Sequence, residues 1–297
     1  GDVLSGTGGY TVQPAGPGVW QPTAPMPPMD PWMANLKPFL RATPDQYTAS
    51  IDPKPDLTSP AYLAELAEVR DLGSAMSATR TPEQSEIAKF WTTNMVIQTN
   101  ASYRNQATIN GLNLMDTARL MAMGNMLASD SLIATFDVKY DLNFNFWRPV
   151  TAIRHTNPDG TYSATELNTW MPVEMTPNFP EYVAGHGSFV AAQADLYAEF
   201  FGFGTDPAVT IDLDSLATNT TRSYASPQAI KDEVINARTW GGMHFRSSTV
   251  LAVDLGETLA ADAFAGSYFD PTGAAGDHAI VSGGIRKFVD SLALPCD

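Results

Sequence analysis

The chain has 297 residues, of which 44% are hydrophobic and 16% are charged. This length and composition are typical of one large globular domain, or of two small ones, with an ample core. The 17 basic and 32 acidic residues give a net charge of -15, which argues against nucleic acid or an anionic membrane as a partner. No apolar run approaches the roughly 18 residues that a transmembrane helix needs.

Two features bear on the cellular compartment. The single cysteine, Cys296, can form no internal disulfide, so the cysteine content does not identify the compartment. The chain begins at Gly1 without an initiator Met, which is typical of a processed or trimmed start. A secreted or periplasmic location is therefore an expectation.

Residues 1–58 are expected to form an irregular, proline-rich arm. The first 60 residues hold 12 of the 22 prolines, and proline favours extended chain over helix. Trp20, Trp32 and Phe39 are scattered along this segment. Their aromatic side chains predict that the arm packs across the surface of a domain and is not a free tail.

Apolar residues at helical spacing predict a series of helices after the arm. Ser59 and Pro60 provide a cap and an N1 proline for the first helix, which Gly73 ends. The segment 112–138 is apolar on nearly all sides, which is typical of a helix at the centre of a bundle. No repeat or internal linker is visible, so we expect one all-α domain over 1–297. Further helices are predicted over 81–100, 150–153, 188–201, 226–240 and 247–264, with a loop over 202–224.

The stretch 178–190 combines an extended approach, small residues and a histidine at a helix start. Gly185 leaves backbone amides uncovered beside His186, and the helix is expected from Ser188 onwards. A helix N-terminus carries free N–H groups and a partial positive charge, so it favours a bound anion. We interpret this stretch as half of an oxyanion site; the alternative is a helix start with a capping-region histidine.

Basic residues elsewhere could supply the other half. Arg238 and His244 are six residues apart with paired glycines between them, so a helix that ends or bends there could aim both into one site. Arg148 offers a planar fork suited to phosphate-like oxygens. The alternatives are a structural arginine followed by a capping histidine, and an arginine stacked on Trp147 or paired with an acid. Lys139 could add charge, but an ordinary surface lysine is the competing interpretation.

The remaining candidates are weaker. His155 and His278 lie in polar, loop-like contexts and are expected at the surface. Ser188 follows Gly-His-Gly, which lacks the GxSxG order of a nucleophile elbow, so a nucleophilic role is a weak hypothesis. No familiar metal-binding motif is present in the sequence.

Three motifs occur in an order that resembles the vanadium-dependent haloperoxidases. They are Phe-Trp-Arg-Pro at 146–149, Pro-Glu-Tyr-x-x-Gly-His at 180–186, and Ala-Arg-x-x-Gly-Gly-x-His at 237–244. The resemblance covers nearly the whole chain, notably the bacterial branch. It implies the helical-bundle fold that this family shares with the type-2 phosphatidic acid phosphatases.

The resemblance also implies a set of roles. His244 would bind vanadium through its ring nitrogen, and His186 would be the acid–base group. Arg148, Arg238 and the Gly185 amide would hold the oxygens of vanadate. The implied cofactor is vanadate, with hydrogen peroxide as co-substrate, and the implied partners are a halide and a small organic substrate. Related bacterial enzymes are often dimers, so a homodimer is a further expectation.

The sequence departs from the family pattern at three positions. Ala184 stands where the family has a serine, and Asp141 stands where it has a lysine that binds the oxyanion. Lys139, nine residues before Arg148, would be that vanadate-binding lysine if the intervening segment carries a two-residue insertion. Ser248 replaces an acid four residues after the last histidine. A hydrogen bond to a charged group contributes roughly 1.5–3 kcal/mol, so the missing serine would weaken oxyanion binding about tenfold to a hundredfold.

The departures leave other functions open. One is a vanadium-free family member that uses His186 and His244 for acid–base chemistry on a small organic molecule. Another is an acid phosphatase in which His244 attacks phosphorus. The last is a binding or assembly protein without catalysis, against which the joint presence of Arg148, His186, Arg238 and His244 argues.

Overall fold

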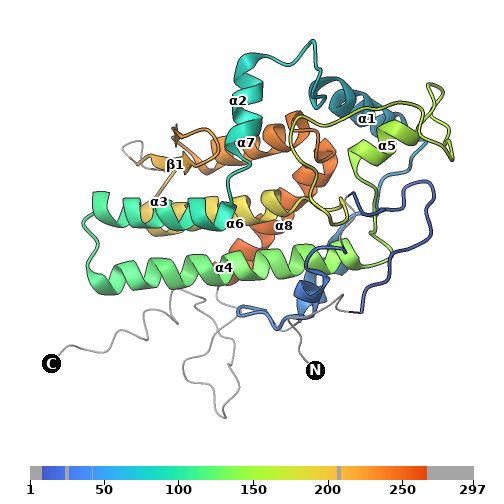
Figure 1. The fold of residues 1–297 in the computed structure, drawn as a ribbon. Helices are drawn as coiled ribbons and strands as arrows, with labels where there is room; N and C mark the ends of the chain where they lie inside the picture. Colours follow the sequence, from blue (N-terminus) through green and yellow to red (C-terminus); the bar gives the residue numbers. More distant parts are fainter. Residues whose placement is uncertain (1–8, 24–26, 42, 206–208, 266–297) are drawn as a thin grey trace.

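The chain folds mostly into helices, which confirms the predicted all-α class (Figure 1). The structure, a computed structural model, describes residues 9–23, 27–41, 43–205 and 209–265. The predicted surface histidine His278 and the single Cys296 lie outside these residues. The α-helices are α1 (Pro60–Leu72), α2 (Pro82–Phe90), α3 (Met95–Ile109), α4 (Leu114–Tyr140), α5 (Pro149–His155), α6 (Gly185–Phe201), α7 (Pro227–Trp240) and α8 (Arg246–Ala265).

The centre of the fold is α6, which lies between α4 and α8 and also packs on α7. It is buried on nearly every side, and α4, predicted to be central, has buried residues from Leu120 to its end at Tyr140. Two glycines let α6 and α8 approach closely. A Cβ added at Gly187 would lie 2.7 Å from the Ala252 Cβ, and one added at Gly256 would overlap the Ser188 carbonyl oxygen. The N-terminal ends of α6 and α8 therefore sit side by side.

The helix predicted over 81–100 is wrong as one element, because it breaks into α2 and α3 at residues 91–94. The Asn94 side chain accepts hydrogen bonds from the N–H groups of Val96 and Ile97 and so begins α3. Asparagine at an N-cap satisfies backbone donors that a continuous helix would bond internally, so it favours a new helix start. The remaining predicted helices are present, and α6 begins at Gly185 rather than Ser188.

The loop predicted over 202–224 contains a small antiparallel hairpin, which the sequence interpretation missed. Its strands are β1 (Ile211–Ser215) and β2 (Thr220–Tyr224), with Ile211 opposite Tyr224 in the register. The inward residues of β1 pack on α3, whereas most of β2 faces solvent.

The N-terminal arm lies against the helical bundle, near the end of α4 that carries the site (Figure 1). The described residues of the arm form two short 3-10 helices, η1 (Pro31–Asn35) and η2 (Pro44–Ser50), and otherwise irregular chain. Trp20 is fully buried, and the Asp130 carboxylate of α4 accepts hydrogen bonds from the N–H groups of Phe39 and Leu40. These contacts hold the described part of the arm against α4, although the Phe39 ring is exposed. Among the described helices, none combines the length and apolarity needed to cross a bilayer.

Candidate functional site

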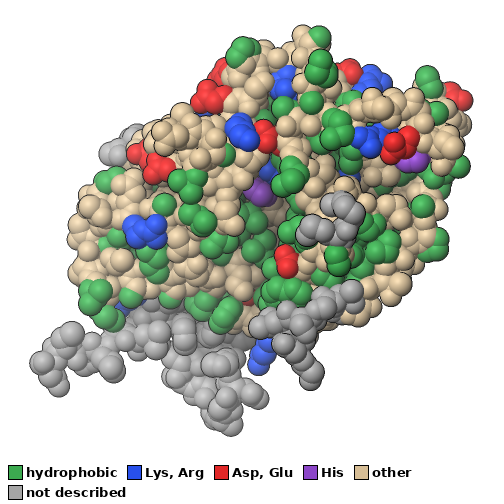
Figure 2. Space-filling view, viewed as in Figure 1, with side chains coloured by type: hydrophobic (Ala, Val, Ile, Leu, Met, Phe, Trp, Pro, Cys, Tyr) green, Lys and Arg blue, Asp and Glu red, His purple; other side chains and the backbone are tan. Residues whose placement is uncertain are grey.

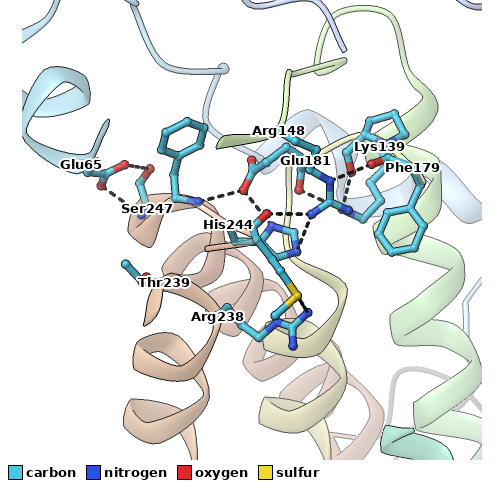
Figure 3. Close-up of polar contacts among 12 residues, drawn as sticks. Glu65, Lys139, Arg148, Phe179, Glu181, Arg238, Thr239, His244 and Ser247 are labelled. Atoms are coloured by element: carbon cyan, nitrogen blue, oxygen red, sulfur yellow. Dashed lines mark hydrogen bonds and ion pairs between the residues drawn. The ribbon is translucent and has the colours of Figure 1, made fainter. Parts of the chain in front are cut away.

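The predicted basic residues come together where several helices begin or end (Figure 3). Lys139 lies in the last turn of α4, Arg148 directly precedes α5, and Arg238 lies in the last turn of α7. His244 lies in the connection between α7 and α8, and its side chain is almost fully buried, as are those three. His186 lies in the first turn of α6.

The connection between α7 and α8 aims His244 into the site. Gly242 adopts φ +77, which a residue with a side chain rarely adopts, so the chain turns sharply after α7. The His244 ring then lies between two partners: its Nδ1 is 2.8 Å from Glu181 Oε1, and its Nε2 is 3.0 Å from Arg148 Nη1. Because a guanidinium only donates, Nε2 accepts and the ring proton sits on Nδ1, donated to Glu181.

Glu181 is a site residue that the sequence interpretation missed. Its buried carboxylate also accepts a hydrogen bond from the Phe245 N–H at 3.1 Å. Burial raises the pKa of Glu181 to about 7, although the nearby Arg148 and Lys139 oppose the shift. The family pattern places the acid that orients the last histidine at position 248, which is a serine here. In this structure Glu181, in the Pro-Glu-Tyr motif, takes that role. That motif was a usable signal, but nothing in the sequence pairs it with His244.

Burial lowers the pKa of His244 well below its ordinary value, and Arg148, Lys139 and Arg238 lower it further. The imidazole is therefore neutral at pH 7. A neutral ring with its proton held on Nδ1 carries its lone pair on Nε2, where that lone pair accepts the hydrogen bond from Arg148 Nη1. Such a nitrogen can act as a ligand or as a nucleophile when Arg148 gives up this hydrogen bond.

Arg148 is fixed by backbone carbonyl groups and an aromatic ring. Its Nε donates to the Phe179 carbonyl oxygen and its Nη1 to the Met243 carbonyl oxygen, both at 2.9 Å. The guanidinium lies over the Phe179 ring, 4.8 Å from the centroid, and does not stack on Trp147 as the alternative interpretation held. The Nη2 atom is buried without a hydrogen-bond partner among the described residues. Burial lowers the pKa of Arg148 to about 10, so it remains charged.

Arg238 is held in a similar way from the other side. Its Nη1 donates to the Trp91 carbonyl oxygen at 3.1 Å and its Nη2 contacts the Met243 sulfur at 3.2 Å. The Nε atom has no hydrogen-bond partner in the described part of the chain. Burial, followed by the neighbouring Arg148, lowers the pKa of Arg238 to about 9. The two arginines thus each retain one buried N–H donor.

Lys139 is fully buried, so its interpretation as a surface lysine is wrong. Its ammonium donates to the carbonyl oxygens of Pro180 and Glu181 at 2.8 and 2.9 Å and lies 5.0 Å from the centre of the Phe179 ring. Burial, then the neighbouring Arg148, lowers the pKa of Lys139 well below its ordinary value. Through its two hydrogen bonds Lys139 holds the segment that carries Glu181. Asp141 caps the end of α4 and accepts a hydrogen bond from the Asn143 N–H within the following turn.

His186 is only partly buried, in contrast to His244. Its Nε2 is buried and has no hydrogen-bond partner among the residues that the structure describes. Burial, then Arg238 and Lys139, lower the pKa of His186 well below its ordinary value. Figure 2 shows a histidine beside a basic side chain within a hollow of the surface. His186 can therefore exchange a proton with a group in the site.

The start of α6 provides amides but no hydroxyl. Ala184 is the N-cap of α6, is fully buried and makes no side-chain cap. Gly185 is the first residue of the helix. Ser188 is also fully buried, and its Oγ lies 2.6 Å from the Thr135 Oγ1, which does not support the weak hypothesis of a nucleophile. His155 is partly exposed and its Nδ1 lies 2.9 Å from the Ser163 carbonyl oxygen, away from the cluster.

The donor set fits a tetrahedral oxyanion. The side chains of Lys139, Arg148 and Arg238 are buried together, and the Glu181 carboxylate is close enough for Arg148 and Lys139 to affect its pKa. An uncompensated buried charge costs several kcal/mol, so a bound anion would stabilise this arrangement. The unpartnered N–H groups of both arginines, with the amide at the start of α6, are the donors that vanadate or phosphate oxygens require.

Comparison with known proteins agrees with this fit. Residues 119–270 match the family model described as the VCPO second helical-bundle domain. The structure of a bacterial vanadium-dependent iodoperoxidase is 27% identical, with a TM-score of 0.69 over 84% of this chain and 61% of that one. No curated protein sequence matches the chain.

Two bacterial vanadium-dependent chloroperoxidase structures share the fold. The apo-type structure is 18% identical with a TM-score of 0.68, over 95% of this chain and 66% of that one. The holo-type structure is 19% identical with a TM-score of 0.62, over 88% and 55%. The chain thus spans 55–66% of the length of these three structures. By the family model and these folds, the chain belongs to the vanadium haloperoxidase family.

Proposed function

We propose that the protein is a vanadium-dependent haloperoxidase, which oxidises a halide with hydrogen peroxide and halogenates a small organic substrate. One observation carries the proposal: the neutral His244 ring presents Nε2 beside the arginine donors that lack partners. A vanadate bound there would supply Lewis-acid activation of peroxide. The likeness to a bacterial iodoperoxidase supports the same class of reaction.

Each residue of the site has a role in this proposal. His244 would be the vanadium ligand, and Glu181 would hold its proton on Nδ1. Arg148, Arg238 and the Gly185 amide would bind oxygens of the anion, and Lys139 would donate a further hydrogen bond to it.

His186 would move protons. Its imidazole is neutral at pH 7, and its Nε2 has no partner in the described chain, so it can accept a proton from peroxide or from water. Its partial exposure gives that proton a route to solvent.

The test is peroxide- and halide-dependent halogenation of monochlorodimedone by protein stripped of metal and then loaded with vanadate. We expect activity only after loading, and ⁵¹V NMR should report bound vanadate. Bound vanadate without turnover with iodide, bromide or chloride would overturn the proposal. Turnover of an organic substrate that persists without vanadate would favour the vanadium-free alternative.

Acid phosphatase activity is a second candidate, which one observation favours. The lone pair on His244 Nε2 is also what attack on phosphorus requires, and phosphate has the shape and charge of vanadate. Hydrolysis of an aryl phosphate by metal-free protein tests it. Hydrolysis that disappears in a His244→Ala variant would support this candidate.

A further inference from the structure

The thioether of Met243 lies inside the anion site, although neither the proposed reaction nor the anion needs it. Met243 is 2% exposed. Its Sδ lies 3.2 Å from Arg238 Nη2, and its backbone carbonyl oxygen accepts from Arg148 Nη1 at 2.9 Å. Figure 3 shows the sulfur, in yellow, next to the Arg238 guanidinium. One residue therefore contacts both arginines of the site.

The contact between Arg238 and the sulfur is weak in its present form. A thioether is a poor hydrogen-bond acceptor, so a guanidinium N–H directed at it is easily taken by a better one. The sulfur has little room to move, because Met243 is 2% exposed and its methyl group lies close to Gly241. Any oxygen added to the sulfur would thus remain near the guanidinium.

We propose that Met243 is an oxidation site that controls anion binding. Hydrogen peroxide transfers one oxygen to the sulfur: an S–O bond forms, the O–O bond breaks, water leaves, and the sulfur is oxidised by two electrons. The sulfoxide oxygen is a strong acceptor and binds Arg238 Nη2, where it competes with an oxygen of the anion. The inference rests on the proposed function, because that reaction brings peroxide to this site.

The surface methionines provide an internal control. Met76 and Met175 are 89% and 88% exposed, so peroxide oxidises them without entering the site. Met243 is 2% exposed, so its oxidation requires peroxide to enter the buried site. A bound anion blocks that approach, so phosphate should slow oxidation of Met243 and leave the rates at Met76 and Met175 unchanged.

The experiment uses the full chain without metal. Phosphate affinity is measured by calorimetry before and after graded treatment with hydrogen peroxide, and peptide mass spectrometry gives the oxidised fraction of each methionine. We expect the Met243 sulfoxide form to bind phosphate about tenfold to a hundredfold more weakly, the effect of one lost hydrogen bond between charged groups. The weakened fraction should follow oxidation of Met243 and not that of Met76 or Met175.

The matched variant is Met243→Leu, which keeps the apolar volume and removes the sulfur. Its phosphate affinity should be the same before and after peroxide. An equal loss of affinity in that variant would assign the effect to another residue and overturn the inference. If the variant does not fold, the correlation within the wild-type protein decides: full Met243 oxidation with unchanged affinity, or no oxidation of Met243 at all, overturns it.

The same measurements separate this inference from the proposed function. Absence of phosphate and vanadate binding before any peroxide is added would count against the anion site itself. Binding that is present at the start and insensitive to Met243 oxidation would count against the inference alone.

Discussion

Glu181 Oε1 lies 2.8 Å from His244 Nδ1, although 63 residues separate the two in the chain. The same oxygen accepts the Phe245 N–H, so one carboxylate fixes both the ring and the backbone next to it (Figure 3). An imidazole whose Nδ1–H is bound in this way keeps its lone pair on Nε2, where a ligand would replace the hydrogen bond from Arg148. The orientation of His244 therefore depends on a residue at the start of another motif.

Two replacements of Glu181 distinguish its effect on the orientation of the His244 ring from its effect on the free energy of unfolding. Glu181→Ala leaves the His244 Nδ1–H and the Phe245 N–H buried without an acceptor, and we expect a loss of about 3 kcal/mol in the free energy of unfolding. Glu181→Gln keeps one acceptor oxygen and should lose less than about 1 kcal/mol. Denaturant unfolding measures both values.

The Gln variant also tests the tautomer. We expect ¹⁵N NMR of the ring nitrogens to show the proton on Nδ1 in the wild-type protein and a mixed population in Glu181→Gln. Vanadate affinity should fall about tenfold to a hundredfold. A His244 ring with unchanged tautomer in this variant would show that Glu181 serves the backbone alone.

Arg148, at the N-cap of α5, lies in the site, whereas Arg154, in the last turn of α5, makes its contacts outside it. Arg148→Lys removes the planar fork, and we expect phosphate affinity to fall at least tenfold. Arg154 bonds the Trp170 carbonyl oxygen and Glu166 on the surface, so Arg154→Lys should change the affinity by less than about threefold. Calorimetry on both variants checks this, and equal effects would contradict the assignment of Arg148.

Ala184→Ser restores a hydroxyl at the N-cap of α6. Serine is the better cap, and its Oγ would lie at the helix start beside the anion. We expect phosphate and vanadate affinity to rise about tenfold. Fluorescence- or calorimetry-based titration gives the value, and an affinity that stays constant would mean that this position faces away from the anion.

The lowered pKa of His186 predicts that the free energy of unfolding depends on pH. Its pKa is lowered in the folded chain, so between the unfolded value near 6.5 and the folded value the unfolded chain binds more protons. The free energy of unfolding therefore falls as the pH drops below about 6.5, by up to ~1 kcal/mol per pH unit for this partly exposed group. His186→Gln removes this contribution.

Comparing His186→Gln with the wild-type protein separates the contribution of His186 from those of other groups that titrate in the same pH range. The stability of His186→Gln relative to the wild type should improve steadily from pH 6.5 to pH 5 and be constant from pH 7 to pH 8. Thermal or urea unfolding at each pH measures it, and a pH-independent difference would mean that His186 is not held neutral.

The sequence was sufficient for the basic residues of the site because each belongs to a local pattern. Arg148 precedes a helix-starting proline, and His186 follows the glycine that starts α6. Glu181 could not be assigned to His244 because their contact is made only when α6 and the connection before α8 come together. The sequence shows a glutamate at position 181, but it does not show which residue that glutamate contacts in the fold.

The fold was predicted to a similar extent. Long apolar periodicity located α4, α6 and α8, but it could not show that the Asn94 side chain begins a new helix. The strand β1 alternates buried and exposed residues over only five positions, too short a pattern to distinguish from a loop.

The close contact of α6 with α8 at Gly187 and Gly256 has a consequence for how the site can change. His186 stands at the start of α6 and His244 directly before α8, so the backbone contact between these helices sets the spacing of the two histidines. A larger residue at either glycine would shift the proton-transfer group relative to the anion-binding group. The distance between His186 and His244 therefore depends in part on Gly187 and Gly256, two residues without a side chain.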